Sequence, residues 1–117
     1  MMHIRHLDIA VIGDEDLVNG LRLAGVRRYH IIENDHNISE EVRKALTEMM
    51  DEPNIGVIVI LEDYMKHVED LIAQVKERKG LPPVIIEVPS KYGTRYDDVA
   101  KYYKAYIRKF IGFDIEI

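Results

Sequence analysis

The sequence predicts an α/β fold of three layers, in which about four parallel strands form a sheet flanked by helices and a C-terminal amphipathic helix follows. Three apolar, β-branched runs at 7–12, 55–61 and 84–88 are typical of strands buried on both faces. Segments with helical periodicity alternate with these runs over short connections, as in parallel sheets. We therefore expect an α/β body over 1–89, a turn-rich hinge at 90–93, and a C-terminal helix and tail over 94–117.

The first predicted unit is a strand, a sharp turn and a short helix. Gly13 lets the chain turn after the strand, and Asp14 is placed to cap the helix that follows. The helix should stop at Gly25. Its predicted buried positions recur at helical spacing: Leu17, Val18, Leu21 and Ala24.

The second predicted unit begins with a short strand at 27–32 and a polar loop. We expect Ser39 to be the N-cap of the next helix, with Glu40 and Glu41 near the positive end of the helix dipole. This helix should run up to Pro53 and bury Val42, Ala45, Leu46 and Met49.

The third helix should follow the strand at 55–61 directly, and Gly80 is its expected C′ residue. Its predicted core stripe consists of Met65, Val68, Leu71, Ile72 and Val75. Pro82 and Pro83 introduce the fourth strand, and Pro89 ends it.

Composition restricts the function. The chain of 117 residues has no cysteine, which excludes disulfides and thiolate chemistry. The net charge of the chain is −5. Residues 94–111 hold five cationic and two carboxylate residues, so the net charge of this segment is +3 and that of the rest of the chain is −8. An acidic body disfavours nucleic-acid binding, and a protein partner is expected instead. No apolar run approaches the roughly 20 residues that span a bilayer, so we expect no direct membrane insertion.

The sharpest hint of chemistry is a set of carboxylates at the ends of two strands. Asp14, Glu15 and Asp16 follow the first strand, and Glu62 and Asp63 follow the third. Such a cluster could bind Mg²⁺ and accept a phosphoryl group, as in receiver domains, with Lys91 as the cationic partner. We favour the alternative that Asp14 and Asp63 are helix caps, because the acidic neighbours also suit the helix dipole. Three carboxylates in place of a glycine-rich loop would repel a nucleotide phosphate.

The remaining candidates for catalysis are weak. The five histidines (His3, His6, His30, His36 and His67) include no pair at i, i+4 that would set two imidazoles on one helix face. Ser39 and Ser90 lack the glycine-flanked turn of a nucleophilic serine. We therefore assign no catalytic, cofactor-binding or metal-binding residue.

Aromatic side chains concentrate in the predicted C-terminal helix. A helix that packs through Tyr96, Tyr103 and Phe110 leaves Tyr102 and Tyr106 on its flank, where they could contact another protein. The same stripe could instead cover the sheet as a fourth helix, and the sequence alone does not choose. The predicted partner-binding residues are Tyr96, Tyr102, Tyr103, Tyr106, Arg108 and Phe110.

Four segments carry a family resemblance that spans nearly the whole chain. They are Ile12-Gly-Asp-Glu-Asp16 with Gly20 and Leu23-Ala-Gly25 after it, Gly56-Val-Ile-Val-Ile60, Pro83-Val-Ile-Ile-Glu-Val-Pro-Ser-Lys91, and the closing Ile107-Arg-Lys-Phe-Ile-Gly112. In these the sequence resembles the F subunit of the archaeal and bacterial A-type, or V-type, ATP synthases. It departs from the usual pattern at Leu17, Asn19 and Arg27.

The resemblance implies a non-catalytic component of the central stalk of a rotary motor, with a body like a receiver or flavodoxin domain. It implies contact with the coiled-coil D subunit of the stalk, and a C-terminal helix that reaches the catalytic hexamer and modulates ATP hydrolysis. It also implies a peripheral position on the cytoplasmic side of the membrane. A receiver-like signalling domain with an acidic, Mg-binding phospho-acceptor pocket is the alternative.

Overall fold

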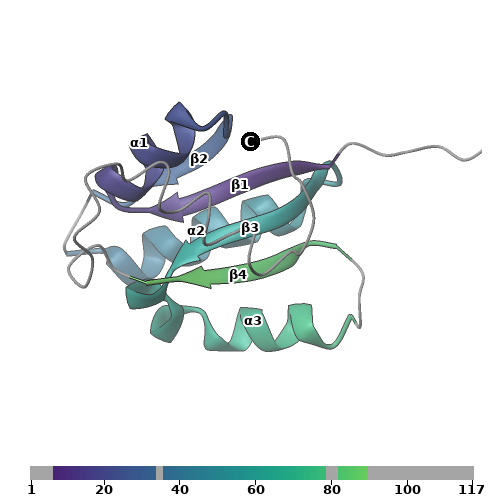
Figure 1. Cartoon of the computed structure of the whole chain (residues 1–117). Helices are drawn as coiled ribbons and strands as arrows, with labels where there is room; N and C mark the ends of the chain where they lie inside the picture. The colour runs from purple at the N-terminus through teal and green to yellow at the C-terminus, as the bar shows by residue number, and fades with distance from the viewer. Residues whose placement is uncertain (1–6, 34–35, 79–81, 90–117) are drawn as a thin grey trace, which may run out of the picture.

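Four strands alternate with helices in the order that the sequence predicts (Figure 1). The structure is a computed structural model that describes residues 7–33, 36–78 and 82–89. The hinge at 90–93 and the C-terminal helix expected over 94–117 lie outside the described residues. The described elements are β1 (Asp8–Gly13), α1 (Glu15–Leu23), β2 (Arg28–Ile31), α2 (Ile38–Met50), β3 (Ile55–Leu61), the 3₁₀ helix η1 (Glu62–His67), α3 (Glu69–Lys76) and β4 (Val84–Val88).

The strands form one parallel sheet in the order β2-β1-β3-β4. The two most apolar strands, β1 and β3, are the central pair, as expected for strands that are covered on both faces. Helices lie on both sides of the sheet, so the predicted three-layer α/β architecture is confirmed.

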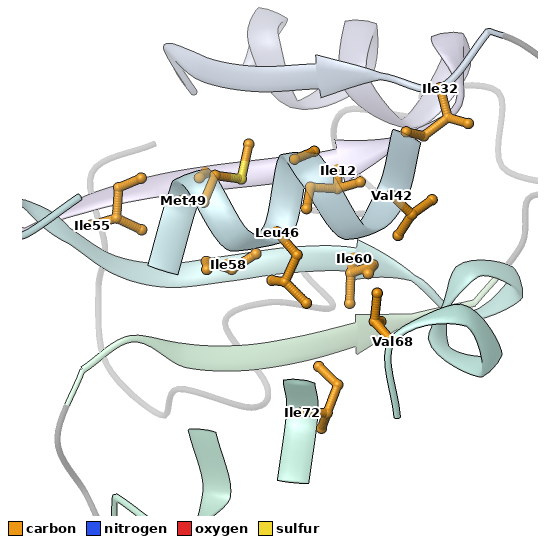
Figure 2. Packing of buried hydrophobic residues seen from close by; sticks show 12 residues of the cluster. Ile12, Ile32, Val42, Leu46, Met49, Ile55, Ile58, Ile60, Val68 and Ile72 are labelled. Atoms are coloured by element: carbon orange, nitrogen blue, oxygen red, sulfur yellow. The ribbon is translucent and has the colours of Figure 1, made fainter. Parts of the chain in front are cut away.

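One face of the sheet is covered by α2 and by the segment formed by η1 and α3. Val42, Leu46 and Met49 of α2 lie against Ile58 and Ile60 of β3 (Figure 2). Val68, at the junction of η1 and α3, and Ile72 of α3 extend this core towards β4. All four predicted core positions of α2 are at most 1% exposed. The sequence therefore identified this face correctly.

The opposite face carries α1. Leu17, Val18 and Leu21 are fully buried against the sheet, as predicted, while Ala24 is half-buried. The main sheet contacts of α1 are with β1 and β2. Among the described elements, α1 is the helix that contributes buried residues to this core.

A β-bulge in β3 decides which of its residues point to each face. Asp8 pairs with Ile55, but the next residue, Ile9, pairs with Val57, so Gly56 is the extra residue. Ile55 consequently packs with Ile58 and Ile60 on the α2 face, although strict alternation would place it on the other. A Cβ atom on Gly56 would lie 2.6 Å from Cβ of Leu7, so only glycine fits without movement.

Three local predictions differ from the structure. Helix α2 begins at Ile38 after Asn37, so Ser39 lies in its first turn and is not the N-cap. The predicted third helix is divided into η1 and α3, which meet at Val68. The N-cap position of η1 is Leu61, so Asp63 lies inside the first turn and caps nothing. Gly80, the expected C′ residue, lies outside the described residues.

Candidate interaction site

The carboxylates that follow β1 and β3 lie at the carboxyl edge of the sheet, because parallel strands end at the same edge. Asp14 is committed to its helix: its Oδ1 accepts a hydrogen bond from the backbone N–H of Leu17 at 2.8 Å. The predicted cap of α1 is thereby confirmed. Glu15, Asp16, Glu62 and Asp63 are exposed around it. This edge is an acidic surface.

The turn between β1 and α1 is filled by the protein itself. A Cβ atom on Gly13 would lie 2.6 Å from Cδ2 of Leu17, so the glycine lets α1 pack closely on β1. The carboxylate of Asp14 accepts a backbone N–H at the start of α1, which in a nucleotide-binding turn would bind a phosphate. The geometry of this turn is that of a packed and capped helix start.

The histidines of the described part have varied environments. His30 Nε2 on β2 and Glu41 Oε1 on α2 are 3.2 Å apart. The backbone carbonyl of His67 accepts a hydrogen bond from Arg43. Within 7–33, 36–78 and 82–89, no three histidine or carboxylate side chains are grouped closely enough to hold a metal ion.

Two arginine-carboxylate pairs join elements that are far apart in the sequence. Arg28 at the start of β2 binds both carboxylate oxygens of Glu52 at 3.0 Å, and this contact raises the pKa of Arg28. Arg43 on α2 binds Asp70 on α3 through two nitrogens at 2.7 and 2.9 Å. The hydrogen bonds from Arg43 hold the pKa of Asp70 at about 2. The first pair links β2 to the turn after α2, and the second links α2 to α3.

Large apolar side chains remain exposed at one end of the molecule. They are Leu7 at 39%, Leu23 at 85% and Val84 at 51%. Leu7 precedes β1 and Val84 begins β4, so both lie at the amino edge of the sheet. Helix α1 returns from the carboxyl edge and ends at Leu23, which brings that residue to the same edge. Sequence reasoning missed this surface, although Leu23 could have been noticed because it falls outside the helical stripe of Leu17, Val18 and Leu21.

The predicted partner-binding residues all belong to the C-terminal segment. Tyr96, Tyr102, Tyr103, Tyr106, Arg108 and Phe110 lie outside the described residues, as does Lys91. Their assignment stays a prediction. None of the described helices has the length and apolarity that crossing a bilayer requires.

Comparison with known proteins decides the family. The family described as ATP synthase (F/14-kDa) subunit matches residues 9–107. The chain belongs to this family. The match covers β1 to β4 and most of the C-terminal segment, so the resemblance noted in the sequence is confirmed.

Curated relatives extend over the same length. The chain is 34% identical to the F subunit of the A-type ATP synthase of Thermococcus sibiricus over 110 residues, which cover 94% of this chain and 99% of the relative. The F subunit of the Methanocaldococcus jannaschii A-type enzyme is 33% identical over 112 residues, with 94% and 100% covered. That of Pyrococcus abyssi is 30% identical over 110 residues, with 94% and 99% covered.

Proposed function

We propose that this chain is a non-catalytic central-stalk, or rotor, component of a proton- or sodium-translocating A-type ATP synthase. The observation that carries the proposal is the agreement in length: several relatives named as the F subunit of A-type ATP synthases align with 94% of this chain and with nearly all of their own length. The protein would belong to a membrane-associated complex, bound peripherally on the cytoplasmic side.

The geometry of the described part supports a role in binding and transmission. Asp14 is engaged in capping α1, and the turn after β1 is filled by Leu17. Arg28–Glu52 links β2 to the turn after α2, and Arg43–Asp70 links α2 to α3. A packed body followed in the sequence by an aromatic segment would suit the transmission of conformational change between larger subunits.

The partners in this proposal are the coiled-coil D subunit of the stalk and the catalytic hexamer. The aromatic and basic residues of 94–111 would supply the contacts, because tyrosine and arginine are enriched at the centres of protein interfaces. Through these contacts the C-terminal segment would modulate ATP hydrolysis and couple ATP synthesis or hydrolysis to ion transport.

Co-expression with the coiled-coil D subunit tests the proposal. We expect a one-to-one complex that survives gel filtration. The variants Tyr102→Ala and Arg108→Ala should weaken it, whereas Thr47→Ala, an exposed position on α2, should not. A chain that ignores the coiled-coil protein, or three variants with equal affinity, would contradict the proposal.

The receiver-like alternative predicts chemistry that can be measured on the same protein. We expect no Mg²⁺-dependent labelling of Asp14, Asp16 or Asp63 by small acyl-phosphate donors. A stable acyl phosphate on any of the three would favour a signalling domain over a stalk component.

A further inference from the structure

The segment that follows β3 forms two short helices where the sequence predicts one. Its apolar stripe has the spacing of a single α-helix, yet the 3₁₀ helix η1 ends at His67 and α3 begins at Glu69. Val68 lies between them with φ −134° and ψ 22°, outside the helical region. Local periodicity therefore does not explain the break.

Backbone hydrogen bonding shows what is replaced at the break. In an α-helix the carbonyl of one residue accepts the N–H four residues later, so the carbonyl of His67 would accept from Leu71. Here it accepts a hydrogen bond from Nη1 of Arg43 on α2 at 3.1 Å. On either side the bonding is regular, because the Val68 N–H closes η1 and the Val68 carbonyl accepts the first bond of α3.

The groups that meet the His67 carbonyl and the Leu71 N–H are themselves paired. Nη1 and Nη2 of Arg43 bind the two carboxylate oxygens of Asp70 at 2.7 and 2.9 Å. The pKa of Asp70 is held at about 2 chiefly by Arg43, and the backbone N–H groups of Asp70 and Leu71 lower it further. The Leu71 N–H therefore faces this carboxylate. One Arg43–Asp70 pair thus occupies both halves of the helical hydrogen bond that would join η1 to α3.

We propose that Arg43 is a positioning residue that holds residues 62–76 in a broken form, and that release of Arg43 joins η1 and α3 into one α-helix. The break is then a two-state element controlled by a side chain of a neighbouring helix. It lies within the α/β body and does not depend on the proposed place of the chain in a stalk.

The two forms differ little in their contacts. The broken form has the hydrogen bonds of Arg43, and the joined form regains the bond between His67 and Leu71. Val68 and Ile72 point into the α2-side core and are four residues apart, so they would share a face in the joined helix as well (Figure 2). The side chains of Arg43 and Asp70 are 42% and 59% exposed, and exposed pairs contribute little to stability. A weak pair can select one form only because the two lie close in free energy.

The two forms would present the carboxyl edge of the sheet differently. A 3₁₀ helix turns by about 120° per residue and an α-helix by about 100°, so the difference over the six residues of η1 amounts to about 120°. Glu62 and Asp63 would therefore turn by about a third of a revolution relative to α3. Tyr64, which packs against the cores on both faces of the sheet, would move with them. The break thus sets the direction in which these carboxylates point.

Substitution of Arg43 tests the device in the full-length protein. In Arg43→Met, which keeps a good helix former at this position, the three-bond HN–Hα coupling of Val68 should fall from the large value of φ near −134° towards the small value of a helix. The Leu71 amide should exchange with solvent at least about threefold more slowly, because its N–H gains the His67 carbonyl. Lys44→Met, at the neighbouring exposed position of α2, should change neither quantity.

The direction of the exchange effect separates this device from a simple tie between α2 and α3. Loss of a simple tie would speed exchange of the Leu71 amide, whereas joining the helices slows it. Asp70→Asn removes the carboxylate but leaves Arg43 on the His67 carbonyl, so it should shift both quantities in the same direction by a smaller amount.

An unchanged coupling at Val68 in Arg43→Met, or a Leu71 amide that exchanges as fast as in the unsubstituted chain or faster, would overturn the proposal. If Arg43→Met lost the chemical shifts of β1 and β3 that mark the folded chain, Asp70→Asn would decide, and unchanged values there would overturn it equally. No partner protein takes part in these measurements, so their failure leaves the one-to-one complex to be tested separately.

Discussion

The two faces of the sheet differ in how far the described chain covers them. The α2 face is packed by α2, η1 and α3, whose apolar residues form a continuous core from β1 to β4. The α1 face has α1 over β1 and β2, and at its amino edge Leu7 and Val84 remain exposed. Both faces bury a hydrophobic core, and within the described residues the α1 face differs in that large apolar side chains stay exposed at its amino edge.

Truncation in the α2 face should have the largest effect on stability. Leu46 is fully buried among α2 and β3 residues, and Leu46→Ala should lower the free energy of unfolding by about 2–5 kcal/mol. Urea denaturation followed by circular dichroism measures this loss. Thr47→Ala, the neighbouring exposed position, should change stability by less than about 0.5 kcal/mol. Similar losses for both would show that this face is not the tightly packed one.

The bulge that distributes β3 between the faces should be the next most sensitive feature. Gly56→Ala places a Cβ atom 2.6 Å from Cβ of Leu7, and the required shift should cost about 1–3 kcal/mol. The double variant Leu7→Gly with Gly56→Ala should lose less stability than the sum of the single variants, because the clash is removed. If urea denaturation showed that the stability losses of the two single variants simply add in the double variant, Leu7 would not be the residue that limits space at Gly56.

Removal of the cap of α1 should act on the α1 face. Asp14→Ala deletes the acceptor of the Leu17 N–H and should cost about 1 kcal/mol, whereas Asp14→Ser retains an acceptor and should cost only a few tenths. Hydrogen exchange should speed up in α1 more than in α2. Equal acceleration in both helices would indicate that the two faces open as one unit.

The smallest expected effect concerns the Arg43–Asp70 pair on the α2 face. Because Arg43 lowers the pKa of Asp70 from 3.8 to about 2, the pair stabilises the fold above pH 4 and loses that contribution as pH falls towards 2. Asp70→Asn should therefore be slightly less stable than the unsubstituted chain at pH 6, and the difference should shrink as the pH falls from 4 through 2. Both groups are well exposed, so the effect should be small. A difference as large at pH 2 as at pH 6 would contradict this assignment.

The fold was largely predictable because the strongest signals are local. The buried stripes of α1 and α2 follow from helical spacing, and β1 and β3 follow from uninterrupted β-branched runs. The start of α2 was predicted at Ser39 because serine is a common cap, but the helix already includes Ile38 and begins without a side-chain cap. Ile38 packs against the α2-side core, so tertiary contact outweighs capping preference there.

The candidate site was only partly predictable. The capping role of Asp14 was expected from its position before a periodic apolar segment, and the structure confirms it. The surface that contains Leu23 and Val84 was not expected, because the two residues are 61 positions apart and only the sheet order brings their elements to one edge. The aromatic residues of 94–111 stay a prediction.

By itself, the sequence determined the order of strands and helices along the chain, the capped acidic turn and the polarity between an acidic body and a basic C-terminal segment. These follow from propensity, periodicity and charge, which act between residues close in the chain. Only the tertiary structure decided the strand order, the bulge that turns Ile55 to the α2 face and the position of the exposed Leu7, Leu23 and Val84 at one edge of the sheet. These depend on contacts between segments distant in the sequence, where packing and pairing select among arrangements that local preferences leave equal.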